Sequence, residues 1–372
     1  MTSAATYSPL AQKVLATRGP VASVYYDDSH DTQDAAERLA VLERDVAREL
    51  EHQGAPHPLI VSVTRAMNER PATEHRSGRA LIVGLDGVAV DEHLVVPPVT
   101  PVIRVSALPF VVPLVDNGFV SGPYMVAAVD QVGADLTRYQ GKSTFSETVV
   151  GEGFPVHKAA SAGLNAWGDS QHRVEEEVRK NLRAVADRLT AEMDGHPLDF
   201  IVLIGQERAR AELVSELPHR VAERIVQPGI GSRQTGVDRV VRAAIVHELN
   251  NRRTIHRNKI MDQYGAEEGR ESGLAVAGLA AVTAALRERS VATLIIGQVH
   301  DETVLAGDDL TLPGTDPETL SDFGIAPTQT LRADEALPYA AMAIGADLVC
   351  APEHLRLTDG VGALLRHAPT QG

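Results

Sequence analysis

Hydrophobic periodicity in the first quarter of the chain predicts a unit of strands and helices. Residues 21–26 alternate and are rich in β-branched and aromatic side chains, which is typical of a strand. Between residues 39 and 50, apolar side chains recur every three or four positions and predict a helix that ends before Gly54. Residues 59–64 predict a second strand. Residues 79–94 predict a hairpin, because they contain an Asp-Gly turn.

The next stretch predicts a break and then a second hairpin. Five prolines between residues 95 and 119 argue against a long helix or a central strand, so irregular extended and edge structure is expected there. Residues 124–128 and 134–139 predict paired strands. A polar loop follows over residues 153–173, and apolar spacing then predicts a long helix over residues 174–193.

The pattern continues as alternating strands and helices. A continuous apolar run at residues 200–204 predicts a strand covered on both faces. Helices are expected over residues 208–217 and 236–250, with a short strand between them at residues 222–227.

The last third of the chain also predicts alternating helices and strands. Residues 273–289 predict a helix, residues 291–296 a buried strand, and residues 302–306 a strand that pairs with it. Residues 347–350 and 360–366 predict two closing strands. The expected fold is therefore α/β, in three layered domains. Their expected bounds are 1–121, 122–262 with the polar loop, and 263–372.

Composition narrows the possible functions. Cys350 is the only cysteine among 372 residues, which excludes intrachain disulfides and Cys-rich zinc sites and fits a cytoplasmic protein. No apolar run reaches the ~18 residues of a membrane span, and no secretory signal is expected. The net charge of −15 argues against a simple nucleic-acid binder. Any RNA contact should therefore come from local basic groups.

Two such groups occur. Residues 251–259 contain several basic side chains and no acid, and residues 65–79 form a second cluster diluted by Glu69 and Glu74. Solvated helix or loop surface is the alternative explanation for both.

Catalytic motifs are not found in the sequence. There is no nucleophile elbow around a serine, no His-Glu-x-x-His, and no Gly-rich phosphate loop. The acidic cluster at residues 27–31 suggests a cation site only weakly, and a solvated turn before a helix explains it better. No metal or other cofactor is expected.

The order of elements from Tyr124 to Lys259 resembles the middle domain of the archaeal and eukaryotic peptide release factor 1 family, which includes Pelota. The helix and strand over residues 274–296 are similar to the opening of that family's kink-turn-protein-like C-terminal domain. Within the family the chain is most similar to the bacterial Balon-type ribosome hibernation factors and to actinobacterial dormancy-associated members. No codon-reading Asn-Ile-Lys-Ser motif is present.

In that family the polar loop carries a Gly-Gly-Gln tripeptide to the peptidyl-transferase centre. Here residues 153–173 lack it: Gly163 and Gly168 are separated, and Gln171 follows Ser170. The resemblance therefore implies a ribosome hibernation factor that spans the A site from decoding centre to peptidyl-transferase centre. It would inhibit translation by occupancy, without enzymatic chemistry.

The resemblance also implies partners and contact residues. The partners are the 70S ribosome, with its 23S and 16S rRNA and ribosomal proteins, and also elongation factor Tu. In the loop, rRNA contacts are expected from His157, Lys158, Asn165, Trp167, Gln171, His172 and Arg173. Elsewhere they are expected from Arg70, His75, Arg76, Arg79, Arg252, Arg253, Arg257 and Lys259.

Two alternatives stay open at this point. One is a rescue factor that hydrolyses peptidyl-tRNA, with Gln171 replacing the missing glutamine. The other is an interaction protein unconnected with ribosomes, since an acidic α/β chain also suits other protein partners.

Overall fold

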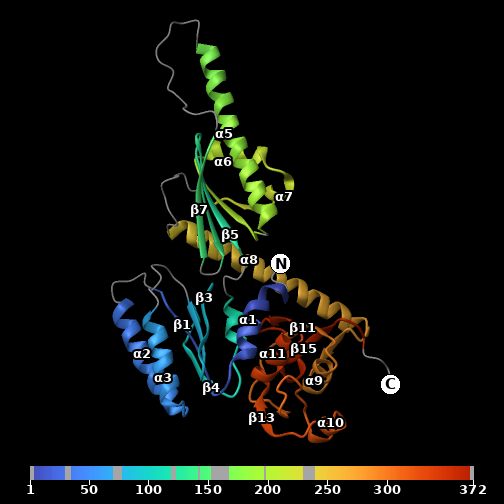
Figure 1. The fold of residues 1–372 in the computed structure, drawn as a ribbon. Helices are drawn as coiled ribbons and strands as arrows, with labels where there is room; N and C mark the ends of the chain where they lie inside the picture. Colours follow the sequence, from blue (N-terminus) through green and yellow to red (C-terminus); the bar gives the residue numbers. More distant parts are fainter. Residues whose placement is uncertain are drawn as a thin grey trace. The chain divides into compact units, whose positions relative to one another are not determined.

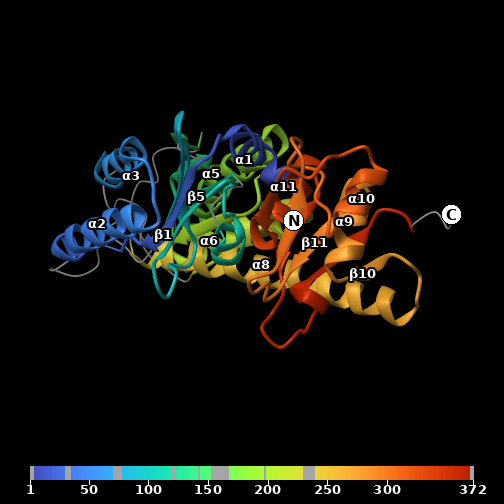
Figure 2. The same cartoon turned by 90° about the horizontal axis from the view of Figure 1, so that it is seen from below.

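Contacts between residues divide the chain into two units, Met1–Val120 with Asn250–Gly372, and Ser121–Leu249. The computed structural model describes residues 4–29, 35–69, 78–118, 123–140, 143–151, 167–196, 198–228 and 239–368. Figures 1 and 2 draw the chain from two directions. Strands and helices alternate in both units, which confirms the α/β class. The division into three domains, with boundaries at 121 and 262, stays a prediction.

The N-terminal part of the larger unit contains one antiparallel sheet and four helices. Its elements are β1 (Val21–Asp27), β2 (Gly78–Gly84), β3 (Gly87–Leu94), β4 (Val102–Ser106), α1 (Ala4–Ala16), α2 (Ala35–His52), α3 (His57–Glu69) and α4 (Val112–Asn117). The strands lie in the order β3-β2-β1-β4. Tyr25 packs with α1 and α4, while its neighbour Tyr26 packs with α2 and α3 on the other face.

Two expectations for this part need correction. The predicted strand at residues 59–64 is wrong, because these residues belong to helix α3. Its buried residues Leu59, Val63 and Met67 recur every four positions, and the β-branched run between them obscured that period. The proline-rich stretch does contain the expected edge strand, β4, but it also contains helix α4. Pro113 is tolerated there because it lies in the first turn.

The C-terminal part of the larger unit is built on a mixed sheet. Its elements are α8 (Arg239–Gly269, from Asn250 on), β10 (Ala275–Ala277), α9 (Leu279–Arg287), β11 (Val291–Ile296), β12 (Thr303–Ala306), α10 (Pro317–Asp322), β13 (Gln329–Arg332), α11 (Ala333–Ala343), β14 (Asp347–Cys350) and β15 (Val361–Leu365). The sheet order is β10-β15-β11-β14. Ile260 and Tyr264 of α8 cover one face, and α9 and α11 cover the other.

Here too the sequence was partly misleading. The segment at residues 302–306 forms a strand, but β12 pairs with β13 and not with β11. The helix expected over residues 273–289 is shorter, because strand β10 precedes it and α9 begins only at Leu279.

One hydrophobic cluster contains residues from both parts of the larger unit. A polar contact lies beside it. The Arg104 guanidinium lies 3.5 Å from the Phe110 ring centroid and donates hydrogen bonds to Asp334 at 2.9 Å and Glu335 at 3.1 Å. Burial raises the pKa of Glu335 although the Arg104 charge opposes the shift. Buried charges of this kind need such partners.

The smaller unit is a mixed sheet between helices. Its elements are β5 (Tyr124–Val129), β6 (Gly133–Gln140), β7 (Ser143–Val150), α5 (Trp167–Gly195), β8 (Ile201–Gly205), α6 (Glu207–Glu216), α7 (His219–Ala222), β9 (Ile225–Val226) and the first residues of α8, up to Leu249. The order is β7-β6-β5-β8-β9, with β8 parallel to β5 and β9. Strand β7 was not predicted. Helix α5 packs on one face of the sheet, and Val241 and Ile245 of α8 pack on the other.

In the part of the chain that the structure describes, no helix is both long and apolar enough to cross a membrane.

Candidate functional site

The loop predicted to be functional lies between strand β7, which ends at Val150, and helix α5, which begins at Trp167. Three of its predicted contact residues lie outside the described residues: His157, Lys158 and Asn165. Four more belong to the first turns of α5, and their side chains also lie outside the described part: Trp167, Gln171, His172 and Arg173. The described site is therefore the base of the loop.

A three-way contact holds the chain where the loop begins. Asp130 Oδ1 accepts a hydrogen bond from the Val132 amide at 2.8 Å, within the turn that joins β5 to β6. The Gly151 amide donates to Val132 O at 3.1 Å. From helix α5, the fully buried Asn181 donates through Nδ2 to Gln131 O at 3.1 Å. The turn thus binds both the strand before the loop and the helix after it.

Glycine is required at position 151 by the close approach of α5. A Cβ atom at Gly151 would lie 2.0 Å from Asn181 Oδ1 and 2.3 Å from Asn181 Cα. The second distance involves the helix backbone, so a rotamer change at Asn181 would not relieve the clash. The strand and the helix therefore touch through backbone at this point.

A buried ion network ties the second half of α5 to the hairpin of β6 and β7. Glu192, 5% exposed, accepts from Arg138 at 2.6 Å and also pairs with Arg188. Arg188 continues the network to Glu147 of β7 at 2.7 Å. Hydrogen bonding to Glu147, with the charge of Glu192, raises the pKa of Arg188. Such a network fixes the position of α5 along the β6–β7 hairpin, because a shift that separated one pair would leave a buried charge unpaired.

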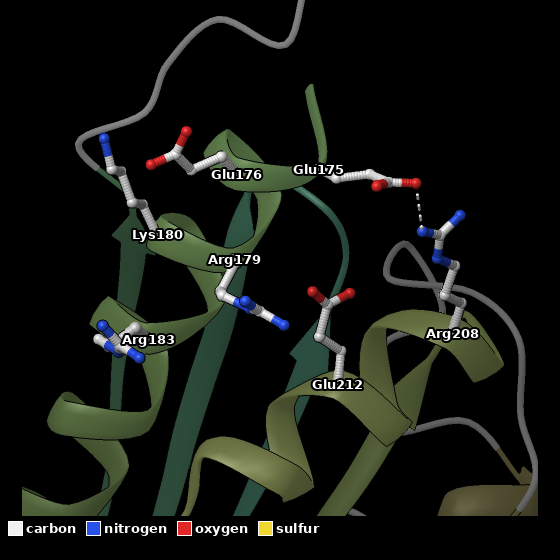
Figure 3. A pocket seen from close by; sticks show the side chains of 7 residues that line it. All are labelled: Glu175, Glu176, Arg179, Lys180, Arg183, Arg208 and Glu212. Atoms are coloured by element: carbon white, nitrogen blue, oxygen red, sulfur yellow. Dashed lines mark hydrogen bonds and ion pairs between the residues drawn. The ribbon is translucent and has the colours of Figure 1, made fainter. Parts of the chain in front are cut away.

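Helix α6 braces the first half of α5 (Figure 3). Arg208 of α6 lies 3.4 Å from Glu175 of α5. Glu216 of α6 lies 3.0 Å from Arg183 and 3.8 Å from Arg179. The arginine side chains of these pairs are exposed to solvent, so each pair contributes about 0–1 kcal/mol to the free energy of unfolding. The apolar contacts of Val178 and Leu182 beneath them hold the helices together.

Between these helices lies an open depression of about 520 Å³. Its walls are charged side chains, drawn in Figure 3: Glu175, Glu176, Arg179, Lys180, Arg183, Arg208 and Glu212. Small-molecule sites are mostly apolar with a few polar groups. This depression has the opposite composition, which favours an extended, charged partner over a small ligand.

Part of the basic run on helix α8 faces inward. Arg253 donates to the carbonyl oxygen of Asp116, and His256 Nε2 lies 2.9 Å from Asp347 Oδ2. Among the other predicted contact residues of this run, Lys259 is exposed, whereas Arg252 and Arg257 are half-buried. The run therefore has an anchoring role within the larger unit, and the predicted rRNA contact through it stays a prediction.

We expect Arg253 and Lys259 to respond differently to charge reversal. Arg253→Glu should lower the thermal unfolding midpoint by several degrees, because it replaces a donor to Asp116 O with a carboxylate. Lys259→Glu should leave the midpoint within about a degree, since exposed substitutions rarely matter. Thermal unfolding followed by circular dichroism measures both. Equal midpoints for the two variants would contradict the anchoring role.

The second predicted cluster yields one correction. Arg70, His75 and Arg76 lie outside the described residues. Arg79 is 1% exposed, and its guanidinium bonds Asp91 at 2.9 Å, Ala66 O at 2.6 Å and both Met67 O and Tyr26 at 3.2 Å. Burial disfavours its charge, but Asp91, Tyr26 and Asp28 together outweigh this and raise the pKa of Arg79. The predicted surface contact through Arg79 is therefore wrong.

Within the described ranges, no group of three His, Cys, Asp or Glu side chains is arranged to hold a metal ion. Burial raises the pKa of the Cys350 thiol, which also lies near the carboxylate of Asp116. A thiol in that state is a poor nucleophile at neutral pH.

Sequence reasoning missed two polar residues of helix α5: Asn181 at the base of the loop, and Glu192 in the buried ion network of its second half. Both are polar side chains close to the apolar stripe of a helix, and Asn181 lies three residues after Val178 and four before Val185. That spacing was the available signal, because a polar residue at a buried helical position must find a partner.

Comparison with known proteins gives this fold its class. A family model described as bacterial archaeo-eukaryotic release factor family 2 matches residues 123–270. The protein Rv2629 of Mycobacterium tuberculosis (strain H37Rv) and MT2704 of strain CDC 1551 are each 45% identical over 359 residues, covering 96% of this chain and 96% of theirs. The class is that of the bacterial proteins related to release factors and Pelota. The chain belongs to the same family as these two mycobacterial proteins, and its residues 123–270 match the model of bacterial archaeo-eukaryotic release factor family 2.

Solved structures of the same kind are similar at low sequence identity. Archaeal translation termination factor aRF1 is 15% identical over 98% of both chains, with a TM-score of 0.24. Archaeoglobus fulgidus Pelota is 11% identical over 96% of this chain and 91% of its own, with a TM-score of 0.38. A ribosome-bound archaeal Pelota is 12% identical over 100% and 96%, with a TM-score of 0.41. The family model over residues 123–270, and not these structures, confirms the predicted resemblance to the release factor 1 and Pelota family. The Balon-type placement stays a prediction.

Proposed function

We propose that this protein binds the ribosomal A site and inhibits translation by occupying it, as a hibernation factor. It acts without hydrolysing peptidyl-tRNA. The partners are the 70S ribosome and its rRNA, with elongation factor Tu as a candidate for delivery.

One observation carries the proposal. A member of a release-factor family has kept the loop between β7 and α5 but has no Gly-Gly-Gln in it. Two adjacent glycines allow the backbone conformations and the close approach to RNA on which hydrolysis depends. The base of that loop is nevertheless well ordered by hydrogen bonds, which join Gly151, Asn181 and the turn at Asp130. Because hydrogen bonds hold the base of the loop while the Gly-Gly-Gln tripeptide is missing, the loop suits binding better than hydrolysis.

The first test is binding and inhibition. Purified protein should co-sediment with 70S ribosomes, and the bound fraction should fall as salt rises, since phosphate contacts release counterions. It should also inhibit synthesis of a reporter in a cell-free translation system. Adding elongation factor Tu with guanine nucleotide to the binding reaction tests delivery. Absence of co-sedimentation at low salt would favour an interaction protein unconnected with ribosomes.

The second test separates hibernation from rescue. Ribosomes that carry labelled peptidyl-tRNA and an empty A site are incubated with the protein, and released peptide is counted over time. We expect release no faster than buffer alone. A release factor with its Gly-Gly-Gln is the positive control. Rapid release by this protein would reject occupancy and establish the rescue factor.

A further inference from the structure

A small cavity lies at the carboxyl ends of the two parallel strands of the C-terminal sheet. Strands β11 and β14 pair in parallel up to Ile296 and Cys350. Residues from the segments that follow them, 297–302 and 351–360, enclose a volume of about 200 Å³. Open α/β sheets bind their ligands in the crevice outside the carboxyl ends of such strands. A cavity in this position is therefore a candidate ligand site.

Backbone contacts hold the two walls of this cavity together. The Gly297 amide donates a hydrogen bond to Gly360 O at 2.8 Å. The Ala351 amide donates to Ile296 O at 2.7 Å. Gly360 has a φ of +73°, and a Cβ atom there would lie 2.2 Å from Gln298 O. The cavity is thus preformed, which lowers the entropic cost of binding a ligand.

The cavity contains charged groups that do not pair with one another. The carboxylate of Glu302 lines one wall, and the carboxylate of Glu353 and the guanidinium of Arg356 line the other. Within the described residues, none of these three side chains has an ion-pair or hydrogen-bond partner. A third carboxylate, that of Asp359, already accepts a hydrogen bond from the Leu279 amide at 3.0 Å. Two anions and one cation therefore remain for a ligand.

The rest of the lining suits a short aliphatic stem. The half-buried side chains of Leu355 and Leu357 line the cavity, and Leu357 also packs against the cluster around Tyr264. The imidazole of His300 and the amide of Gln298 add hydrogen-bonding groups. The volume lies below the range of about 300–1,000 Å³ that is typical of drug-sized ligands. The cavity therefore suits a small ligand that combines an apolar stem with charged ends.

We propose that this cavity binds a basic amino acid, arginine or lysine, by its charged ends. Arg356 binds the α-carboxylate, and Glu302 and Glu353 bind the cationic side chain and the α-ammonium group. Two cations and one anion of the ligand thus match two carboxylates and one guanidinium of the protein. The methylene stem lies against Leu355 and Leu357. The ligand is either the free amino acid or the C-terminal residue of a protein chain, and its binding does not depend on the proposed ribosome binding.

Calorimetric titration of the full-length protein tests this assignment. L-Arginine should bind saturably at one site. Agmatine, which lacks the carboxylate, and L-norvaline, which lacks the guanidinium, should each bind at least about tenfold more weakly, because a charge-assisted hydrogen bond is lost. Nα-acetyl-L-arginine distinguishes the two sources. Binding equal to that of L-arginine supports a C-terminal residue, and much weaker binding supports the free amino acid. Absence of saturable binding by both would overturn the proposal.

Variants test the role of each charged group. Arg356→Gln should lower the affinity for L-arginine about tenfold without weakening agmatine. The double variant Glu302→Gln and Glu353→Gln should weaken both ligands. Because the protein has a net charge of −15, any cation is attracted to it to some extent. The double variant Glu318→Gln and Asp322→Asn removes the same charge from exposed positions of α10, and it should keep wild-type affinity for both ligands.

The outcomes are distinct. Wild-type affinity of Arg356→Gln for L-arginine would overturn the proposed carboxylate contact. Equal weakening by the cavity variant and the α10 variant would attribute binding to overall charge and overturn the site. Circular dichroism melting should show every variant folded, since all the substituted side chains are exposed. Failure of the protein to sediment with ribosomes would reject the proposed function and leave this site standing.

Discussion

Replacement of Arg79 by methionine is expected to destabilise the N-terminal sheet by about 3–5 kcal/mol. Methionine is similar in length but cannot donate a hydrogen bond, so the half-buried carboxylate of Asp91 would lose its ion pair with this guanidinium. The carbonyl groups of Ala66 and Met67, at the end of helix α3, would lose their donor as well. The change should appear as a lower midpoint of urea unfolding, followed by far-ultraviolet circular dichroism.

The matched control is Arg65→Met in the same helix region. Arg65 is 65% exposed and pairs with Glu69 at 3.3 Å on the helix surface. Its replacement should change stability by less than about 0.5 kcal/mol. A stable Arg79→Met protein that loses ribosome binding would contradict the structural role and restore Arg79 as an RNA contact.

The fold could be predicted from the sequence wherever one face of an element is buried. Helix α2, the Asp86-Gly87 hairpin and strand β8 were anticipated on periodicity and turn chemistry. Helix α3 was mistaken for a strand because its residues 60–64 are mostly β-branched, and packing against the sheet overrides such local propensity. Strand β7 was missed because its residues are largely exposed, so hydrophobic and polar residues do not alternate regularly along its sequence.

The roles of the site residues were harder to predict from the sequence than the fold was. Basic residues can be counted in a sequence, but their partners are distant in it. Arg79 lies beside a polar stretch and resembles a surface residue, yet Asp91 and the end of α3 enclose it. Likewise, Gly151 is unremarkable until helix α5 is placed against it. Long-range contacts, and not residue type, decide these roles.

Replacement of Gly151 by alanine is expected to destabilise the smaller unit by about 2–3 kcal/mol, the range typical of overpacking. The added methyl group would lie 2.3 Å from Asn181 Cα, so α5 must move away from β7. That movement would also strain the hydrogen bond from Asn181 to Gln131 O. The measurement is the thermal unfolding midpoint, supported by amide hydrogen exchange over residues 128–134 and 178–185, where protection should fall.

Gly195→Ala is the control, because the same methyl group there would meet no atom within 4 Å. Gly195 is the last residue of α5, so alanine should be neutral or slightly stabilising. If both variants melt like wild type, the backbone contact at the base of the loop does not hold α5. If Gly151→Ala alone is destabilised, ribosome binding by that variant shows whether the loop must be held by its base to act. Under the proposed function its affinity should fall even at temperatures where the protein is fully folded.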